Sequence, residues 1–262
     1  MQPNQAPVPS SLLRVATYNI HKGVRGIGPA KRLEIHGLGN AIQSLQADVV
    51  MLQEVHAFHH GHAQAFAHSQ PAWPQQQQAE FLAPAGYYSI YRTNAVTRHA
   101  EHGNALLSKW PLGESMHKDV SHHRFEQRGI LHVPLMWQDT QVHMVVAHLG
   151  LMHASRVYQV QHIARFMAEH IPPSAPLILG GDFNDWAERL DAPLKSLGLA
   201  RAIPTTKPKS LLWRTFPSRV PVFSLDRIYT RGFSCIGCEV PKGHHWARLS
   251  DHLPLVVDLA LI

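Results

Sequence analysis

The N-terminal part of the chain alternates between apolar and polar positions in a pattern that predicts a strand, a helix and a second strand. Residues 13–20 (LRVATYNI) alternate and are rich in β-forming residues, which is typical of a strand. Apolar residues between positions 33 and 45 then recur at helical spacing, and residues 48–53 (DVVMLQ) form the short apolar run of a buried strand. This order predicts a layered α/β fold.

The pattern breaks in residues 56–80, which are rich in His, Gln and Ala and carry Pro71 and Pro74 on either side of Trp73. We interpret this stretch as a surface loop that can carry a short helix. A second interpretation is a metal-binding histidine tract, formed from His56, His59, His60, His62 and His68. The irregular spacing of these histidines favours the solvated loop.

The rest of the chain predicts short strands and two helices. Strands are expected at residues 87–92, 105–108, 129–137, 141–149, 176–179, 225–230 and 255–262, with a hairpin turn over residues 138–140. Apolar positions repeat at helical spacing over residues 154–170, and residues 187–197 also favour a helix. Because there is no repeat of fixed period and no clear linker, we expect one domain over residues 12–262.

Residues 1–11 are polar and rich in Gln and Pro, and they lack the basic-then-apolar order of a signal peptide. We interpret them as a disordered lead-in to a cytoplasmic protein, which we expect to be a monomer. No apolar run reaches the ~20 residues that a membrane-spanning helix needs. The sequence therefore predicts no transmembrane segment.

The composition is that of a globular protein, with 45% hydrophobic and 16% charged residues among 262. The formal net charge of +6 suits a polyanionic partner such as a nucleic acid or an acidic lipid headgroup. Solubility alone is the alternative explanation of this charge.

Two cysteines, Cys235 and Cys238, stand in a C-x-x-C pattern. A structural zinc site would need a second pair of ligands at suitable spacing, and a redox pair should open a helix after a strand. Gly232, Gly237 and Pro241 argue against a helix here. We therefore expect two thiols on or beside a strand, without a function of their own.

Polar residues that follow apolar runs are the main chemical feature of the sequence. They are Asn19, Glu54, His148, Asp182, Asn184, Asp226, Asp251 and His252. In a layered α/β protein, strand ends and the loops after them deliver side chains into one cleft. Each residue alone also has an ordinary explanation: a turn former, a helix cap, a core histidine or a member of a surface ion pair.

The arrangement of these residues resembles the endonuclease/exonuclease/phosphatase superfamily, also called DNase I-like, over nearly the whole chain. The motifs that carry the resemblance occur in family order: TYNI, LQE, GNALLSKWP, HLG, GDFN, LDRIY and SDH. Several of them are similar to those of a bacterial subgroup of hydrolases. The resemblance implies a four-layered α/β sandwich, in which two mixed β-sheets pack together and helices flank them.

The resemblance also implies roles for the site residues. Glu54, Asn19 and Asp251 would hold Mg²⁺, a cation that prefers oxygen ligands, with Mn²⁺ as a substitute. Asp182 would activate the attacking water, and Asn184 would donate to a phosphoryl oxygen. His252, oriented by Asp226, and His148 would contact the phosphate from two sides. Attack would be in line with the leaving oxygen.

Substrate contacts are expected from Asn104, in the GN motif, and from Arg128. The expected reaction is hydrolysis of a phosphodiester in a nucleic acid or a phospholipid-type headgroup. A phosphomonoesterase acting on a small phosphate ester and a catalytically inactive binding protein are the alternatives. Residues 56–80 and 204–224 are the expected specificity segments, because specificity lies in loops grafted on the fold. LQEVH in place of the LQETK of abasic-site endonucleases disfavours abasic DNA.

Overall fold

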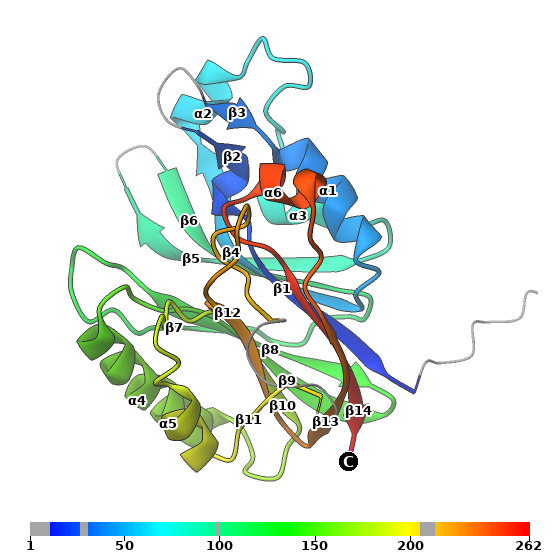
Figure 1. Ribbon diagram of the computed structural model, residues 1–262, viewed down its shortest axis with the longest axis vertical. Helices are drawn as coiled ribbons and strands as arrows, with labels where there is room; N and C mark the ends of the chain where they lie inside the picture. Colours follow the sequence, from blue (N-terminus) through cyan, green and yellow to red (C-terminus); the bar gives the residue numbers. More distant parts are fainter. Residues whose placement is uncertain (1–10, 27–30, 98–99, 205–212) are drawn as a thin grey trace, which may run out of the picture.

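The computed structural model describes residues 11–26, 31–97, 100–204 and 213–262. The predicted disordered lead-in, apart from Ser11, lies outside the described residues. The same holds for residues 205–212 of the predicted specificity segment 204–224. In the described parts, two six-stranded sheets form the centre of the molecule (Figure 1).

The first sheet has the strand order β13-β14-β1-β4-β6-β5. Its strands are β1 (Leu13–Asn19), β4 (Val49–His59), β5 (Tyr88–Val96), β6 (Ala100–Ser108), β13 (Phe233–Glu239) and β14 (Leu255–Leu261). Strands β1 and β4 are parallel, and every other neighbouring pair in this sheet is antiparallel.

The second sheet has the order β11-β12-β10-β9-β8-β7. Its strands are β7 (Met116–Asp119), β8 (Gly129–Trp137), β9 (Thr140–His148), β10 (Leu177–Asp182), β11 (Ala200–Arg201) and β12 (Asp226–Arg231). It repeats the pattern of the first sheet, because the central pair β9–β10 is parallel and the other pairs are antiparallel.

Helices cover the outer face of each sheet, which gives four layers (Figure 1). Helices α1 (Ile35–Ser44), α3 (Gln78–Leu82) and α6 (His244–Leu249) lie on the first sheet. Helices α4 (His153–His170) and α5 (Asp191–Ser196) lie on the second. The 3₁₀ turn η1 (His21–Gly23), the strands β2 (Val24–Arg25) and β3 (Arg32–Leu33), and helix α2 (His60–Ala65) lie at one end of the first sheet.

Three apolar layers hold the four layers of backbone together. Along β1, Leu13 and Val15 face the core between the sheets, whereas Ala16 and Tyr18 face the core beneath α1. A third core joins α4 to the second sheet. A strand that is covered on both faces has apolar residues at successive positions, which explains the nearly continuous apolar runs in the sequence. No helix in the described ranges is long and apolar enough to cross a membrane.

The fold class and most of the predicted elements are confirmed. The hairpin turn over residues 138–140 is present, and its two central residues, Gln138 and Asp139, have positive φ as a type I′ turn requires. Both cysteines lie on β13, and burial raises the pKa of Cys235 to about 12, so Cys235 is a weakly reactive thiol.

Two predictions about elements were wrong in extent, and some elements were not predicted. The segment 56–80 does not begin as a loop, because β4 continues to His59 and pairs with β6 beyond two register shifts. The helix expected at residues 187–197 is limited to α5, since Glu188 has a positive φ (53°) that α-helical backbone excludes. Helix α6 and the edge strand β7 were not predicted, because neither has a clear apolar period.

Gly181 allows the second sheet to form beside the candidate site. A Cβ atom at this position would lie 1.8 Å from the carbonyl oxygen of Ala147 on the neighbouring strand β9. Because that contact is with backbone, a side chain could be accepted only if the two strands moved apart. Gly181 therefore permits the close approach of β9 and β10.

We expect Gly181→Ala to lower the free energy of unfolding by more than about 2 kcal/mol, because overpacking against backbone is not relieved by rotamer changes. Urea unfolding followed by circular dichroism measures the change. Gly39→Ala is the matched control, since a Cβ there meets nothing within 4 Å in helix α1 and should stabilise by about 0.5–1 kcal/mol. Equal stability of the two variants would contradict the proposed close packing.

Candidate active site

The candidate residues meet where the central parallel strands of the two sheets end. Asn19 is the last residue of β1 and pairs with Gln53 on β4. Glu54 is the residue after Gln53. His148 and Asp182 are paired at the ends of β9 and β10, and Asp226 at the start of β12 is paired with Asp182. The Nδ2 atom of Asn19 donates to Oδ2 of Asp182 at 3.1 Å, which joins the two sheets at this point.

Asp182 is the centre of the cluster. Its Oδ2 atom lies 3.6 Å from Nε2 of His148 and 3.7 Å from Nε2 of His252, in addition to its contact with Asn19. Its other oxygen accepts the backbone N–H of Asn184 at 2.9 Å. Burial raises the pKa of Asp182 to about 6, against the lowering effect of His252, so this carboxyl can take up a proton near neutral pH.

His252 and His148 have opposite electrostatic settings. Burial lowers the pKa of His252, but the charges of Asp226 and Asp182 outweigh it and raise the pKa to about 10. Nδ1 of His252 lies 2.7 Å from Oδ2 of Asp226, which fixes the ring. Burial, aided by the charge of Arg128, holds the pKa of His148 well below its usual range. The cluster thus combines a cationic and a neutral imidazole around one carboxylate.

Glu54 enters the site through a bulge in β4. The register of β4 against β6 shifts between Leu52 and Val55, and Glu54 has φ of 55°, a conformation that non-glycine residues rarely adopt. Such backbone costs on the order of 1–3 kcal/mol and is concentrated at functional sites. The bulge turns the carboxylate toward Asn19, whose Nδ2 lies 3.5 Å from Oε1.

The residues predicted to hold a metal fit a cation with oxygen ligands. Oε2 of Glu54 is buried and has no hydrogen-bond partner within the described ranges, although Nζ of Lys22 lies 3.4 Å away. Burial opposes ionisation of Glu54, but nearby positive charge, including that of Lys22 and His21, lowers its pKa to about 2. Glu54 is therefore an ionised, buried oxygen donor, which is what a divalent cation requires.

Asp251 completes the acidic side of the site. Burial opposes its ionisation, but a hydrogen bond with His21 and the charges of His252 and His21 together outweigh it and lower the pKa to about 2. Nδ1 of His21 lies 3.3 Å from Oδ1 of Asp251 and 4.0 Å from Oε2 of Glu54, so this ring lies between the two carboxylates. Asn19 directs its amide nitrogen toward Glu54 and its oxygen toward the N–H of His21. The oxygen is the atom that Asn19 can offer to a cation, since its nitrogen is held by Asp182.

Asn184 lies beside Asp182 in a left-handed conformation, with φ of 48°. Its Nδ2 donates to the carbonyl of Leu149 at 2.9 Å. Nε of Arg128 donates to the same carbonyl at 3.2 Å, and its Nη2 lies 3.4 Å from Glu126. The loop after β9 therefore holds both predicted side chains near His148.

Asn104 is fully buried, and its hydrogen bonds go to backbone carbonyls. Its Nδ2 donates to the carbonyls of Gly129 and Val146, so this residue of β6 in the first sheet binds β8 and β9 of the second. The observed contacts are those of a bridge between the sheets. Its predicted contact with substrate stays a prediction.

Asp185 and Arg227, which the sequence analysis missed, form a fully buried ion pair directly behind the site. Nη1 of Arg227 lies 2.9 Å from Oδ2 of Asp185, and Nη2 donates to the Asp185 carbonyl at 2.7 Å. Asp185 also accepts the N–H of Leu190 at 2.8 Å. Because Asp185 follows Asn184 and Arg227 follows Asp226, this pair fixes the two segments that carry these candidate residues relative to each other.

An aromatic group borders the site next to His252. The ring of Phe216 lies 4.8 Å from that of His252, and Trp186 packs edge-on against Phe216 and Phe223. Trp186 and Phe223 are 41% and 37% exposed. These rings offer an apolar surface to a group attached to the phosphate.

The chain matches a protein-family model and a known relative over most of its length. The model of the Endonuclease/Exonuclease/phosphatase family matches residues 16–252. "Uncharacterized protein YbhP" of Escherichia coli strain K12 is 34% identical over 252 residues, which cover 95% of this chain and 96% of that protein.

Two solved structures illustrate the likeness in fold. An endonuclease/exonuclease/phosphatase family protein from Leptotrichia buccalis matches 94% of this chain and 99% of its own, with a TM-score of 0.72 at 17% identity. The mannosyl-6-phosphatase Bt3783 of Bacteroides thetaiotaomicron matches the same shares, with a TM-score of 0.70 at 18% identity. At these identities the likeness shows the fold alone.

We expect Arg227→Met to lower the free energy of unfolding by about 3–5 kcal/mol, because it leaves the buried charge of Asp185 without its partner. Arg201→Met is the control: this arginine pairs with the half-exposed Glu188, and such pairs contribute less than about 1 kcal/mol. Urea unfolding measures both changes. A loss no larger than that of the control would show that the buried pair does not organise the site.

Proposed function

Because this chain belongs to the endonuclease/exonuclease/phosphatase family, we propose that it is a Mg²⁺-dependent phosphoesterase that hydrolyses a phosphodiester by in-line attack of an activated water. The observation that carries the proposal is the position of Asp182, whose Oδ2 faces His148, His252 and Asn19 at the junction of the two sheets. An acceptor for a proton, cationic groups for a phosphate and oxygen ligands for a metal thus lie within one cluster.

Glu54, Asn19 and Asp251 would hold the metal, with Mn²⁺ as a substitute for Mg²⁺. A bound divalent cation supplies a Lewis acid that polarises a phosphoryl oxygen and stabilises the charge that develops on it. Lys22 and His21 contact these carboxylates in the structure, so they would move away from them when the cation binds.

Asp182 would orient the attacking water and accept its proton. A group with pKa near the working pH is an efficient general base, since it is largely ionised yet still basic. The hydrogen bond from the backbone of Asn184 keeps the carboxylate in place. The side chain of Asn184 would exchange its bond to Leu149 for one to a phosphoryl oxygen, as a neutral donor can without adding charge.

His252 would bind the phosphate as an imidazolium, since Asp226 stabilises its charge and fixes its orientation. His148 is the neutral imidazole on the other side of Asp182, and it would hydrogen-bond the phosphate from there. Burial and the charge of Arg128 lower the pKa of His148, and Nε of Arg128 donates to the carbonyl of Leu149, the residue after His148. Arg128 would add a cationic contact at the edge of the site.

A diester with an apolar or planar group fits the surroundings of this cluster. Trp186 and Phe223 offer partly exposed rings beside His252. A pocket of about 430 Å³ behind Asp251 is lined by Arg219, Lys242 and Arg248 among others, which suits further negative charge on the substrate. A nucleic acid and a phospholipid-type headgroup both combine these features. Action as a monomer in the cytoplasm stays a prediction.

A phosphomonoesterase is the second candidate, and the mannosyl-6-phosphatase among the similar structures favours it. The solved structure of a zebrafish (D. rerio) TDP2 with single-strand DNA product, at 15% identity, favours a nucleic acid. The two alternatives differ in whether one or two ester groups surround the phosphorus, so paired model substrates can distinguish them.

We expect Mg²⁺-dependent hydrolysis of bis-p-nitrophenyl phosphate in preference to p-nitrophenyl phosphate, with EDTA abolishing it. DNA, RNA and phospholipid vesicles then rank natural substrates. Asp182→Asn and His252→Ala should each lower kcat by about 10²-fold or more, because each group acts in the transition state. Asp139→Asn, in an exposed turn, is the matched control. Normal kcat in either site variant would overturn the assigned chemistry, and preference for the monoester would favour the second candidate.

We expect Glu54→Gln to raise the Mg²⁺ concentration for half-maximal activity by about tenfold or more, because a neutral amide is a far weaker ligand for a hard cation. Titration of activity with Mg²⁺ measures this, with Glu169→Gln on the exposed face of α4 as control. An unchanged titration would remove Glu54 from the metal site.

A further inference from the structure

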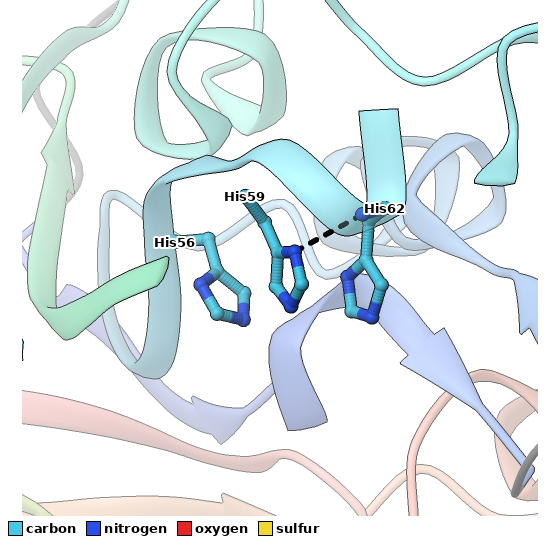
Figure 2. A group of neighbouring side chains, drawn as sticks. All are labelled: His56, His59 and His62. Carbon is cyan, nitrogen blue, oxygen red and sulfur yellow. Dashed lines mark hydrogen bonds between the residues drawn. The ribbon is translucent and has the colours of Figure 1, made fainter. Parts of the chain in front are cut away.

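A second group of side chains with metal-ligating chemistry lies at the end of β4 and in α2, and it shares no residue with those assigned to catalysis. His56 and His59 are on β4 and His62 is on α2, and Figure 2 shows the three rings side by side with their edges directed the same way. One nitrogen from each ring lies within 4.8 Å of the others. His56 and His62 are buried.

His56 is oriented as a metal-binding histidine is. Its Nδ1 lies 2.8 Å from the carbonyl oxygen of Glu101, to which it can only donate. With the proton held on Nδ1, the lone pair is on Nε2, which is buried and has no hydrogen-bond partner in the part of the chain that the structure describes. A ligating histidine commonly donates its other N–H to a backbone carbonyl, which fixes the tautomer.

His62 presents a second such nitrogen. Its Nδ1 is buried without a hydrogen-bond partner from any described residue. The ring lies 5.2 Å from that of the buried Trp73. Burial lowers the pKa of His62 to about 4, so the imidazole is neutral, which is the form that binds a metal. A buried polar atom that lacks a partner costs about 1–3 kcal/mol, and a metal ion would remove that cost.

His59 connects the other two. Its ring stacks on His62 with centroids 3.5 Å apart and planes at 10°. Its Nδ1 accepts the backbone N–H of His62 at 3.0 Å, so ligation through Nδ1 would replace this bond at the start of α2. Ligand nitrogens around a tetrahedral ion with bonds of about 2.0–2.1 Å are separated by about 3.4 Å. The nitrogens therefore need to approach one another by little more than 1 Å. Because the lone pairs lie in the ring planes, the stacked rings of His59 and His62 must also tilt apart so that both point at one ion.

We propose that His56, His59 and His62 form a binding site for a transition-metal ion of the Zn²⁺ class. Imidazole nitrogens suit Zn²⁺ and its neighbours, whereas Mg²⁺ requires oxygen ligands, so this site and the catalytic site select different ions. Three protein ligands leave the fourth position of a tetrahedral ion to water. The spacing of these histidines along the sequence is irregular because the three residues span the change from strand to helix.

The ion would fasten α2 to the end of β4 next to the catalytic cluster. The N–H of His56 is held by the side chain of Gln78, which also donates to the carbonyl of Lys22. Lys22 in turn contacts Glu54. An ion at the histidines would thus stabilise the wall of the site that carries Glu54, without touching substrate.

Isothermal titration calorimetry tests the proposal. EDTA-treated protein is titrated with Zn²⁺ in the presence of excess Mg²⁺, which occupies the oxygen ligands. One Zn²⁺ should bind, and Co²⁺ in its place should give the visible absorption of a tetrahedral nitrogen site. His62→Ala should weaken binding by about tenfold or more, since loss of even an outer hydrogen bond to a ligand costs 10–100-fold. His68→Ala, an exposed histidine of the same segment, should leave binding unchanged.

The wild-type protein alone also decides the question. Saturating Zn²⁺ should raise Tm, because an ion that binds only the folded state stabilises it. Absence of tetrahedral Co²⁺ bands and of a Tm shift in the wild type would overturn the proposal, even if His62→Ala did not fold. An equal loss of binding in His68→Ala would also overturn it. Because every readout is binding or stability, the outcome is independent of whether the protein hydrolyses phosphate esters.

Discussion

The contact that the rest of the site depends on is the hydrogen bond between Asn19 and Asp182 across the junction of the two sheets. A buried carboxylate is stable only when donors or positive charges surround it. Asp182 accepts hydrogen bonds from Asn19 of the first sheet and from the backbone of Asn184, and it faces the ring of His252 from the loop before β14. Each sheet has one parallel pair at its centre, and the ends of these pairs bring the polar residues to one place. The three apolar layers therefore set the geometry of a small polar cluster that no single strand could form.

The buried pair of Asp185 and Arg227 gives this cluster its rigidity. Both charges are fully buried, so their attraction is offset by desolvation and the pair adds little net stability. Its effect is positional, because it joins the segment of Asp182 and Asn184 to the strand that begins with Asp226. The orientation of His252 by Asp226 then follows from the same contact.

The sequence predicted what lies at strand ends and missed what holds those ends together. Asp182, Asp226 and His252 follow apolar runs, which is a local signal that needs no knowledge of the fold. Arg227 and Asp185 are 42 positions apart and each looks like a solvated charge in its own segment, so only the packed structure reveals their pairing. The sequence favoured a solvated loop for the histidines of β4 and α2 for a similar reason. A segment that is part strand and part helix follows neither the period of a strand nor that of a helix.

The placement of β1 between β14 and β4 has a consequence for how the chain folds. Arg14 on β1 binds Asp258 on β14, a residue 244 positions later. During synthesis β1 emerges well before β14, so one edge of β1 has no native partner until a segment 244 positions later has been made. An unpaired strand edge is a surface through which nascent chains can associate wrongly. The first sheet, and with it the junction that carries the candidate site, is therefore completed only after that later segment has emerged.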